Sequence, residues 1–439
     1  MKSRLLFVCA IIFAFNSLQA HVTTVDSIKA NPGRAGGIYL AYPVSDKTVL
    51  KRTPVPEGFS SFYVSHYGRH GSRYLISDND YQKVINLLSE ADANGALTAR
   101  GSLLLAQMDS IYDEARGRGG ELTPLGVRQH KQIAQRLIKE NPDVFEGTPE
   151  ITAASTVVMR CAHSMFAFCE GLKEVDPSLE ISRESADRNM YYLNYHTEES
   201  NKHSGKNGDW YQLWKKFRNE KTNAERLVSS IFNDADFVDR RVDPQEFMWD
   251  LYWVTVDLQN METPIRLYDL FTAQELFDLW QVFNFNFYAC NSSYPLAEGT
   301  LTDNAANLVQ NILTTAQDYI NNGKNGATLR FGHDGNIIPL TALLRLEDCY
   351  AYEIDPHNLA GVYADYSISP MASNFQMIFY KNPETGEILV KMMQNEQEIG
   401  IPDVATDIYP YYRWDVMEKW LRNVIETPSK SFIPKNKNL

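Results

Sequence analysis

The chain has 439 residues, of which 44% are hydrophobic and 22% charged, and its 42 basic and 55 acidic residues give a formal net charge of −13. This composition is typical of a globular protein and argues against disorder, collagen and coiled coil. Because no basic surplus or basic stripe is available to neutralise phosphates, the sequence does not favour binding to nucleic acid. A local group of arginines can still bind a small anion, whatever the overall charge.

The first twenty residues form a pattern of their own. Lys2 and Arg4 precede an apolar run over residues 5–15, and a short stretch then ends on the small residue Ala20. This is the arrangement of a secretory signal peptide cleaved after Ala20, and the run is too short to cross a bilayer. No later stretch is long and apolar enough for a membrane span. We therefore expect an exported protein that loses residues 1–20, acting in the periplasm or outside the cell.

Four cysteines follow this leader: Cys161, Cys169, Cys290 and Cys349. An exported protein can form disulfides, and four cysteines allow three pairings. Cys161 and Cys169 lie eight residues apart in a helical pattern, about 12 Å along the axis, so they should not bridge each other. Four free thiols are an equally good interpretation. There is no CxxC pair and no zinc-type spacing, so we expect no metal site, and the chemistry considered below requires no other cofactor.

Strand and helix patterns alternate in the first part of the mature chain. After an irregular N-terminal wrap at 21–58, the aromatic and β-branched run at 61–65 predicts a buried strand. A Gly-rich turn follows, and then three helices, recognised by their capping residues and apolar period. They are a helix capped by Ser77 or Asp78 and ended by Asn94–Gly95, one with apolar positions from Leu104 to Ala115, and one opened by Thr123–Pro124. A strand at 151–154 and a helix from about Val157 complete an α/β pattern with helical crossovers.

The character of the sequence changes near Asp187. Five of the seven tryptophans lie between Trp210 and Trp280, within a stretch of aromatic helical patterns that reaches about Leu296. We interpret the aromatic stripes around Trp249, Trp253 and Trp280 as helical core and not as a sugar platform. Strand patterns return with Leu329–Phe331 and with a hairpin formed by 377–380 and 388–392. The predicted fold is α/β, a central mixed sheet flanked by helices, in two parts (21–186 and 297–439) with a smaller all-α domain inserted at 187–296.

The sharpest chemical signal follows the first predicted strand, in the run Arg69-His70-Gly71-Ser72-Arg73. The glycine lets the backbone turn tightly and approach a ligand. Two guanidinium groups can clamp phosphate oxygens, and a neutral imidazole between them can attack phosphorus. The alternative is a basic surface turn that contains a satisfied histidine.

Two further fragments extend this pattern. Arg160 lies just inside a helix that follows a strand, where the helix N-terminus favours anions, although an arginine at such a place is usually solvated. His333 and Asp334 follow the strand at 329–331. Asp334 can protonate a departing alkoxide, and a positively charged His333 can hydrogen bond to phosphoryl oxygens. The alternative is a turn in which the carboxylate caps a helix.

Together these fragments resemble the histidine acid phosphatase family, the clade-2 branch of the histidine phosphatase superfamily. The resemblance covers most of the mature chain, in order, and rests on four motifs. They are Arg69-His70-Gly71-Ser72-Arg73 (R-H-G-x-R), Glu121-Leu122-Thr123-Pro124-Leu125-Gly126 (L-T-x-x-G), Ser155-Thr156…Arg160…Ser164…Phe168, and His333-Asp334. It implies that His70 is the phosphohistidine nucleophile, that Arg69, Arg73, Arg160 and His333 hold the phosphoryl group, and that Asp334 is the general acid.

Departures from the family pattern bear on the substrate. Tyr74–Leu75 stands where the family often has proline after the second arginine, and the Arg73–Tyr74 pair is similar to multiple inositol polyphosphate phosphatases. The late His-Asp-Gly is instead similar to phytases, glucose-1-phosphatases and general acid phosphatases, and Met165 replaces a usual small residue. The resemblance implies a phosphomonoesterase for inositol polyphosphates, with a broad-specificity acid phosphatase or a sugar-phosphate phosphatase as alternatives. A non-catalytic phosphate-binding module is the distant alternative.

Five weaker residues are candidates for secondary contacts to such a substrate: His66, Arg183, Arg188, Lys202 and Lys206. The basic residues lie near the start of the predicted helical domain, where they could grip further phosphate groups. A packed histidine at the strand end and a solvated basic loop are the alternatives. The expected partner is thus a small anionic phosphate ester, without nucleic acid, and the oligomeric state stays open.

Overall fold

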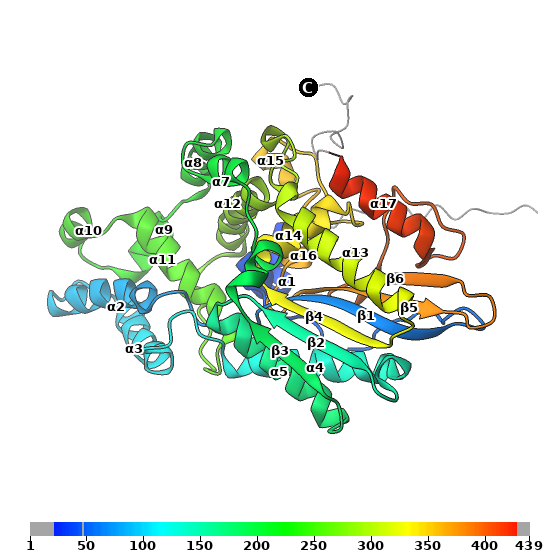
Figure 1. Ribbon diagram of the computed structural model, residues 1–439. Helices are drawn as coiled ribbons and strands as arrows, with labels where there is room; N and C mark the ends of the chain where they lie inside the picture. Colours follow the sequence, from blue (N-terminus) through cyan, green and yellow to red (C-terminus); the bar gives the residue numbers. More distant parts are fainter. Residues whose placement is uncertain (1–21, 46–47, 428–439) are drawn as a thin grey trace, which may run out of the picture.

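The computed structural model describes residues 22–45 and 48–427, so the signal-peptide pattern at 1–20 lies outside the described residues (Figure 1). Its centre is an eight-stranded sheet of order β3-β2-β4-β1-β5-β6-β7, with β8 paired to β6. The strands are β1 Ser60–Arg69, β2 Glu150–Ser155, β3 Ile181–Ser185, β4 Gly326–Gly332, β5 Asn374–Lys381, β6 Ile388–Gln394, β7 Gln397–Ile399 and β8 Tyr411–Arg413. Strands β3, β2, β4 and β1 are parallel neighbours, whereas β5 to β8 pair in antiparallel fashion. The predicted mixed sheet of an α/β protein is confirmed.

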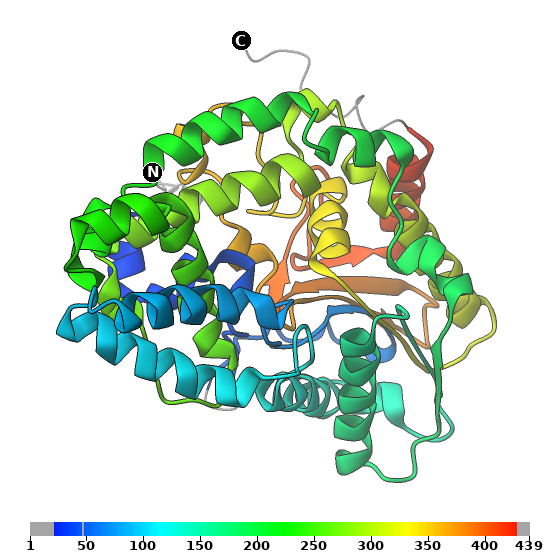
Figure 2. The same ribbon diagram turned by 90° about the vertical axis from the view of Figure 1, so that its left-hand side faces the viewer.

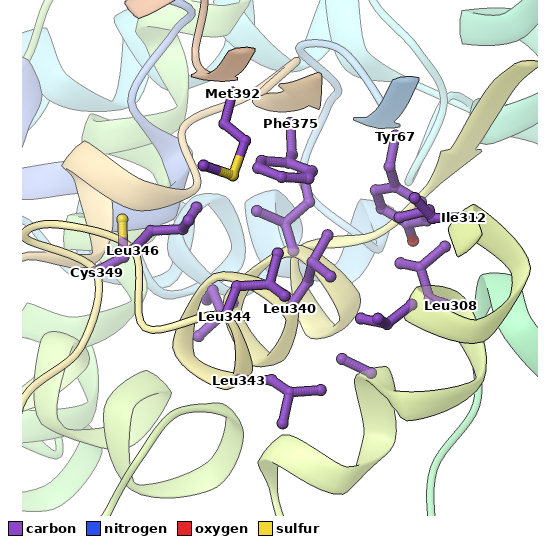
Figure 3. Close-up of a cluster of buried hydrophobic side chains, with 14 of the residues drawn as sticks. Tyr67, Leu308, Ile312, Leu340, Leu343, Leu344, Leu346, Cys349, Phe375 and Met392 are labelled. Atoms are coloured by element: carbon purple, nitrogen blue, oxygen red, sulfur yellow. The ribbon is translucent and has the colours of Figure 1, made fainter. Parts of the chain in front are cut away.

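Helices cover both faces of this sheet. On β1, Tyr63 and Tyr67 belong to the hydrophobic cluster that contains the long helices on one face, while Val64 belongs to the cluster on the other. This alternation follows from the two-residue period of a strand. The first face carries α13 Ala306–Asn321, α14 Asp334–Leu343 and α17 Trp414–Glu426, and the second carries α4 Pro124–Glu140 and α5 Met159–Val175 (Figure 1). Figure 3 shows Leu340 of α14 in the buried hydrophobic cluster that also contains Phe375 of β5 and Met392 of β6.

A helical region extends from the end of the sheet where the sequence motifs lie (Figures 1 and 2). It has its own hydrophobic cluster, to which Trp280 and Tyr252 belong, both fully buried. The main helices are α2 Asp78–Ala93, α3 Ala99–Ala115, α8 Asp209–Lys221, α9 Glu225–Ile231, α10 Ala235–Arg241, α11 Pro244–Asp257 and α12 Ala273–Asn291. The predicted helical segment 187–296 supplies most of this region. Helices α2 and α3 add to it from the first part of the chain, because they share that cluster.

Several predicted boundaries are formed by the capping groups that marked them in the sequence. The Ser77 hydroxyl accepts from the Asn79 N–H at the start of α2, and the Thr123 hydroxyl accepts from the Gly126 N–H at the start of α4. Such side chains satisfy amides that the first helical turn leaves unpaired.

Shorter elements complete the chain. They are α1 Val25–Ala30, the 3-10 segment Pro32–Tyr39, α6 Met190–Leu193, α7 Glu198–Ser204, α15 Pro356–Leu359 and α16 Asp365–Ile368, besides short 3-10 turns. The N-terminal wrap predicted as irregular therefore contains two helical pieces. Within the described ranges, no helix is both long and apolar enough to cross a membrane. The four cysteines of the described residues are free thiols, which is one of the two interpretations that the sequence allowed.

Candidate active site

The motif-bearing segments meet because the strands before them are parallel neighbours. Strand β1 ends at Arg69, which is in register with Gly332 at the end of β4, and β4 in turn pairs with β2. The carboxyl ends of parallel strands lie at one edge of a sheet, and ligands of α/β proteins bind outside that edge. His70, Arg160 and His333 therefore come together although long stretches of chain separate them.

These segments line a cavity of about 370 Å³. Its polar walls come from the motifs, and the rings of His70 and His333 face one another edge-on with centroids 5.8 Å apart. The remaining walls are mostly apolar. The lining residues are Ile38, Tyr39, His70, Arg73, Leu75, Ile76, Asp80, Arg160, Trp253, Phe283, Phe287, His333 and Asp334.

The turn that carries His70 is held rigidly. Gly71 packs so closely on the start of α4 that a Cβ there would lie 2.6 Å from the Gly126 carbonyl oxygen. The Thr123 N–H and hydroxyl both donate to the Ser72 carbonyl, at 2.9 and 3.1 Å. The Gly71 N–H donates to the hydroxyl of Ser164 on α5 at 3.1 Å. These contacts explain why glycine, threonine and serine stand at those places in the three motifs.

His70 is poised as a neutral imidazole. Its side chain is 2% exposed, and its Nδ1 lies 2.9 Å from the Gly71 carbonyl oxygen. Since a carbonyl only accepts, Nδ1 carries the proton and Nε2 keeps its lone pair. Burial, together with the charges of Arg69, Arg160 and Arg73, holds the pKa of His70 well below its usual range. A deprotonated ring nitrogen among positive charges is suited to attack an anionic phosphate ester.

Three guanidinium groups surround the place that such an anion would take. Arg69 is fully buried and is anchored through Nη1, which donates to the carbonyls of Ile38 at 2.6 Å and Ser369 at 2.7 Å. Arg73 is 5% exposed and lies over the ring of Tyr39, with 4.7 Å between its Cζ and the ring centroid. The Nε atoms of Arg69, Arg73 and Arg160 are buried and have no hydrogen-bond partner among the described residues. Unpaired buried donors are costly, and a bound anion would offset that cost.

Asp334 and His333 begin α14 on the other side of the cavity. Asp334 Oδ2 lies 2.9 Å from Arg69 Nη2, and its Oδ1 accepts from the Gly335 N–H at 2.8 Å. Burial acts to raise the pKa of Asp334, but Arg69, with His333 and the Gly335 N–H, holds it below its usual range. Burial lowers the pKa of His333 to about 4, and Arg160 and Arg69 act in the same direction. A pKa of this size favours the neutral imidazole of His333 at neutral pH, whereas a charged imidazole was considered from the sequence.

The sequence profile of the histidine phosphatase superfamily (branch 2) matches residues 68–395, which include the histidines, arginines and aspartate of the four sequence motifs. The chain belongs to this superfamily branch. None of the curated proteins matches the sequence. Among solved structures, a multiple inositol polyphosphate phosphatase of Bifidobacterium longum, in complex with inositol hexasulfate, is similar with a TM-score of 0.75 at 18% identity, over 88% of this chain and 97% of that one. The phytase from D. castellii is similar with a TM-score of 0.65 at 16% identity, over 93% and 88% of the two chains.

The weaker contact candidates lie away from the cavity of this histidine phosphatase. His66 is 1% exposed and packs between Phe168 and Phe331, with ring centroids 4.8 and 5.4 Å away. Its side chain points to the face of the sheet that carries α5, so the alternative of a packed histidine describes it.

The four basic candidates lie on or just after β3 and α7. Arg183 is exposed on the edge strand β3, and Arg188 forms an ion pair with Glu184 of that strand. Lys202 on α7 and Lys206 after it are exposed. None of them lines the cavity, because the sheet edge and α7 present them to solvent.

Other residues near the site lie outside the four sequence motifs. Tyr67 of β1 reaches the His333 N–H with its hydroxyl oxygen, 3.3 Å away. His196, between α6 and α7, lies beside the acid, since a Cβ on Gly335 would be 3.7 Å from its Nε2. Tyr39, Trp253 and Phe283 form the apolar walls. Only tertiary structure brings these groups to the site. The described residues contain no group of three or more His, Cys, Asp or Glu side chains that could hold a metal ion.

Proposed function

We propose that this protein is an exported phosphomonoesterase that hydrolyses inositol polyphosphates through a phosphohistidine intermediate. One observation carries the proposal: a neutral, buried His70 stands among three arginines, with the carboxyl group of Asp334 in the wall of the same cavity. Nucleophile, anion clamp and acid are thus present together, as phosphoryl transfer requires.

In the first step, His70 Nε2 donates its lone pair to phosphorus and the ester P–O bond breaks. Arg69, Arg73, Arg160 and His333 stabilise the charge on the transferring group. Asp334 gives its proton to the departing oxygen, which leaves as an alcohol. The entering phosphate competes with Asp334 for Arg69, and this raises the pKa of the carboxyl group toward the protonated state that the step needs.

In the second step, water attacks phosphorus on the opposite side from His70 and the P–N bond breaks. The ionised Asp334 accepts the proton of that water, so inorganic phosphate forms and the acid is restored. The electron pair of the P–N bond returns to Nε2. The surrounding arginines favour this neutral imidazole as the product of the step.

Inositol polyphosphates are supported by the Arg73–Tyr74 pair and by the fold neighbours, one solved with inositol hexasulfate and another a phytase. Export is supported by the pattern of residues 1–20. A sugar-phosphate or broad-specificity phosphatase is the second candidate. The walls favour it, because Tyr39, Trp253 and Phe287 are apolar and the basic residues from Arg183 to Lys206 stay outside the cavity.

The test measures inorganic phosphate released from myo-inositol hexakisphosphate and p-nitrophenyl phosphate between pH 3 and 8, with and without chelator. We expect chelator-resistant release that is lost in His70→Ala and kept in His163→Ala, a control at an exposed histidine of α5. Substantial release by His70→Ala would reject the mechanism. The ratio between the two substrates decides between a specialist and a generalist.

A further inference from the structure

A second cavity, of about 540 Å³, adjoins the catalytic one. Its walls come from α2, α8, α11 and α12 in the helical region, which faces the viewer in Figure 2. The two cavities share Asp80, Trp253 and Phe283 as lining residues. A substrate whose phosphate contacts His70 therefore has room to extend past Trp253 into the second space.

Aromatic rings form much of this cavity. Tyr211 and Trp214 of α8 are stacked, with centroids 5.6 Å apart and planes at 23°. Trp249 and Trp253 of α11 lie 5.7 Å apart. Trp249 and Trp280 are buried, as expected for core residues, but Trp214 and Trp253 are only partly buried and line the cavity. Trp253 packs against two core clusters, as predicted, and its remaining surface lines the cavity.

The positive and negative charges in the lining of the second cavity are equal in number. Three cations and three carboxylates line it: Lys83, Lys215, Arg218, Asp80, Glu246 and Asp250. Lys83 Nζ lies 3.4 Å from Asp250 Oδ1, and Arg218 Nη2 lies 2.8 Å from Glu246 Oε1. A site for a polyanion needs a surplus of positive charge, and this one has none. Further phosphate groups of a polyphosphate are thus poor occupants.

The same lining suits an uncharged ring that carries hydroxyl groups. Carboxylates accept hydrogen bonds, ammonium and guanidinium groups donate them, and the amides of Asn219 and Asn286 do both. Aromatic faces provide apolar contact for the C–H surface of such a ring. Mixed polar groups around an apolar floor are typical of small-molecule sites.

We infer that this cavity is a binding subsite for a neutral glycosyl unit attached to the group that carries the scissile phosphate. The inference rests on the proposed function for the phosphate end of the substrate. It extends the substrate class to phosphorylated di- and oligosaccharides, in which one ring is esterified and the next ring is uncharged.

Two matched pairs of esters test the subsite: glucose 6-phosphate against trehalose 6-phosphate, and glucose 1-phosphate against maltose 1-phosphate. In each pair the second ester adds only a neutral ring. We expect a kcat/KM at least about tenfold higher for the disaccharide ester of one pair, through a lower KM, because a few new hydrogen bonds and one ring contact are worth about that factor. Trp214→Ala and the less disruptive Asn286→Ala remove this preference and leave turnover of the monosaccharide ester unchanged. Tyr191→Ala, at an exposed tyrosine outside both cavities, is the matched control.

Binding keeps the test independent of catalysis. Calorimetry on His70→Ala should give tighter binding of the disaccharide ester than of its partner, and His70→Ala combined with Asn286→Ala should abolish the difference. Equal affinities in both pairs, or a preference that survives both cavity variants, would overturn the subsite. The subsite would also be overturned if adenosine 5′-monophosphate bound in a Trp214-dependent way and the disaccharide esters did not. That result would indicate that the cavity binds a flat aromatic group. If neither myo-inositol hexakisphosphate nor p-nitrophenyl phosphate is hydrolysed, the proposed function fails, while the calorimetry still decides the subsite.

Discussion

Arg69 and Asp334 join the two halves of the catalytic cavity through an ion pair, with 2.9 Å between Nη2 and Oδ2. Arg69 is fully buried at the end of β1, and Asp334 is the first residue of α14. The pair keeps the carboxyl group ionised in the free protein. Its proton-donating form therefore has to be produced by the substrate, whose phosphate competes for the same guanidinium group.

Asp334→Asn should reduce turnover according to the leaving group. We expect a loss of about a thousandfold with an alkyl phosphate, because general acid catalysis is worth about 10²–10⁴-fold. The loss should be much smaller with p-nitrophenyl phosphate, whose leaving oxygen needs little protonation. Single-turnover rates on both substrates measure the difference. Asp80→Asn, in the wall of the same cavity, is the control, and equal losses for both substrates would contradict the role of acid.

Activity on alkyl phosphates should fall as pH rises. The step needs protonated Asp334, and Arg69 holds the pKa of that carboxyl group below its usual range in the free protein. The protonated fraction therefore decreases from acidic pH upward, and the optimum should lie on the acid side of neutrality. A pH profile of kcat/KM, which reports ionisations of the free enzyme, measures this fall in activity. In Asp334→Asn this fall in activity with pH should disappear. A pH profile unchanged by the substitution would assign the ionisation to another group.

Arg160→Ala should weaken transition-state stabilisation more than substrate binding. Removing one donor from an anion site costs about 10²–10³ in kcat, or about 3–4 kcal/mol. Arg160→Lys should recover part of this, because it keeps the charge but loses the fork geometry. Product inhibition by inorganic phosphate gives a second readout, with weaker inhibition expected in both variants. An Arg160→Ala enzyme with unchanged kcat would place this arginine outside the phosphate contacts.

Two buried histidines should make the fold sensitive to acid. Burial lowers the pKa of both His66 and His130 to about 3, so the unfolded chain binds their protons first as pH falls below about 6.5. Each then removes about 1.4 kcal/mol of the free energy of unfolding per pH unit. In His66→Phe the loss of stability between pH 6.5 and 5 should shrink by about 2 kcal/mol. Urea unfolding at both pH values tests this, with His163→Phe, at an exposed position, as the control.

Reductant should not change the stability of the protein. The four cysteines of the described residues are free, and Cys161, Cys169 and Cys349 are buried. The thiol count of the denatured protein should be the same before and after reduction, with the same unfolding midpoint in both. A lower count before reduction would reveal a disulfide.

The features that sequence predicted well are local ones. Caps at Ser77 and Thr123, the strand before His70 and the helix that contains Cys161 depend on residues a few places apart. The candidate residues Arg69, His70 and Arg73 could be singled out for the same reason, since they lie within one short turn.

The sequence did not predict features that depend on residues far apart in the chain. Strand β3, Ile181–Ser185, is a mostly polar edge strand that owes its conformation to pairing with β2. The 3-10 segment near the N-terminus was expected to be irregular, yet its Ile38 carbonyl anchors Arg69. Apolar periodicity in α2 shows which face is buried but not that α11 covers it. Tyr39 and Trp253 reach the cavity only through such packing.

The position of β1 in the sheet also has a consequence for biosynthesis. This strand ends next to His70, the proposed nucleophile, and within the described part of the chain it pairs only with β4 and β5, which begin at Gly326 and Asn374. As the chain emerges from the ribosome or crosses a translocon, β1 has no strand to pair with until β4 and β5 appear, when most of the chain has been made. The centre of the sheet is thus completed late, and a chain released before Gly326 would lack both the acid and the neighbours that hold the nucleophile in place.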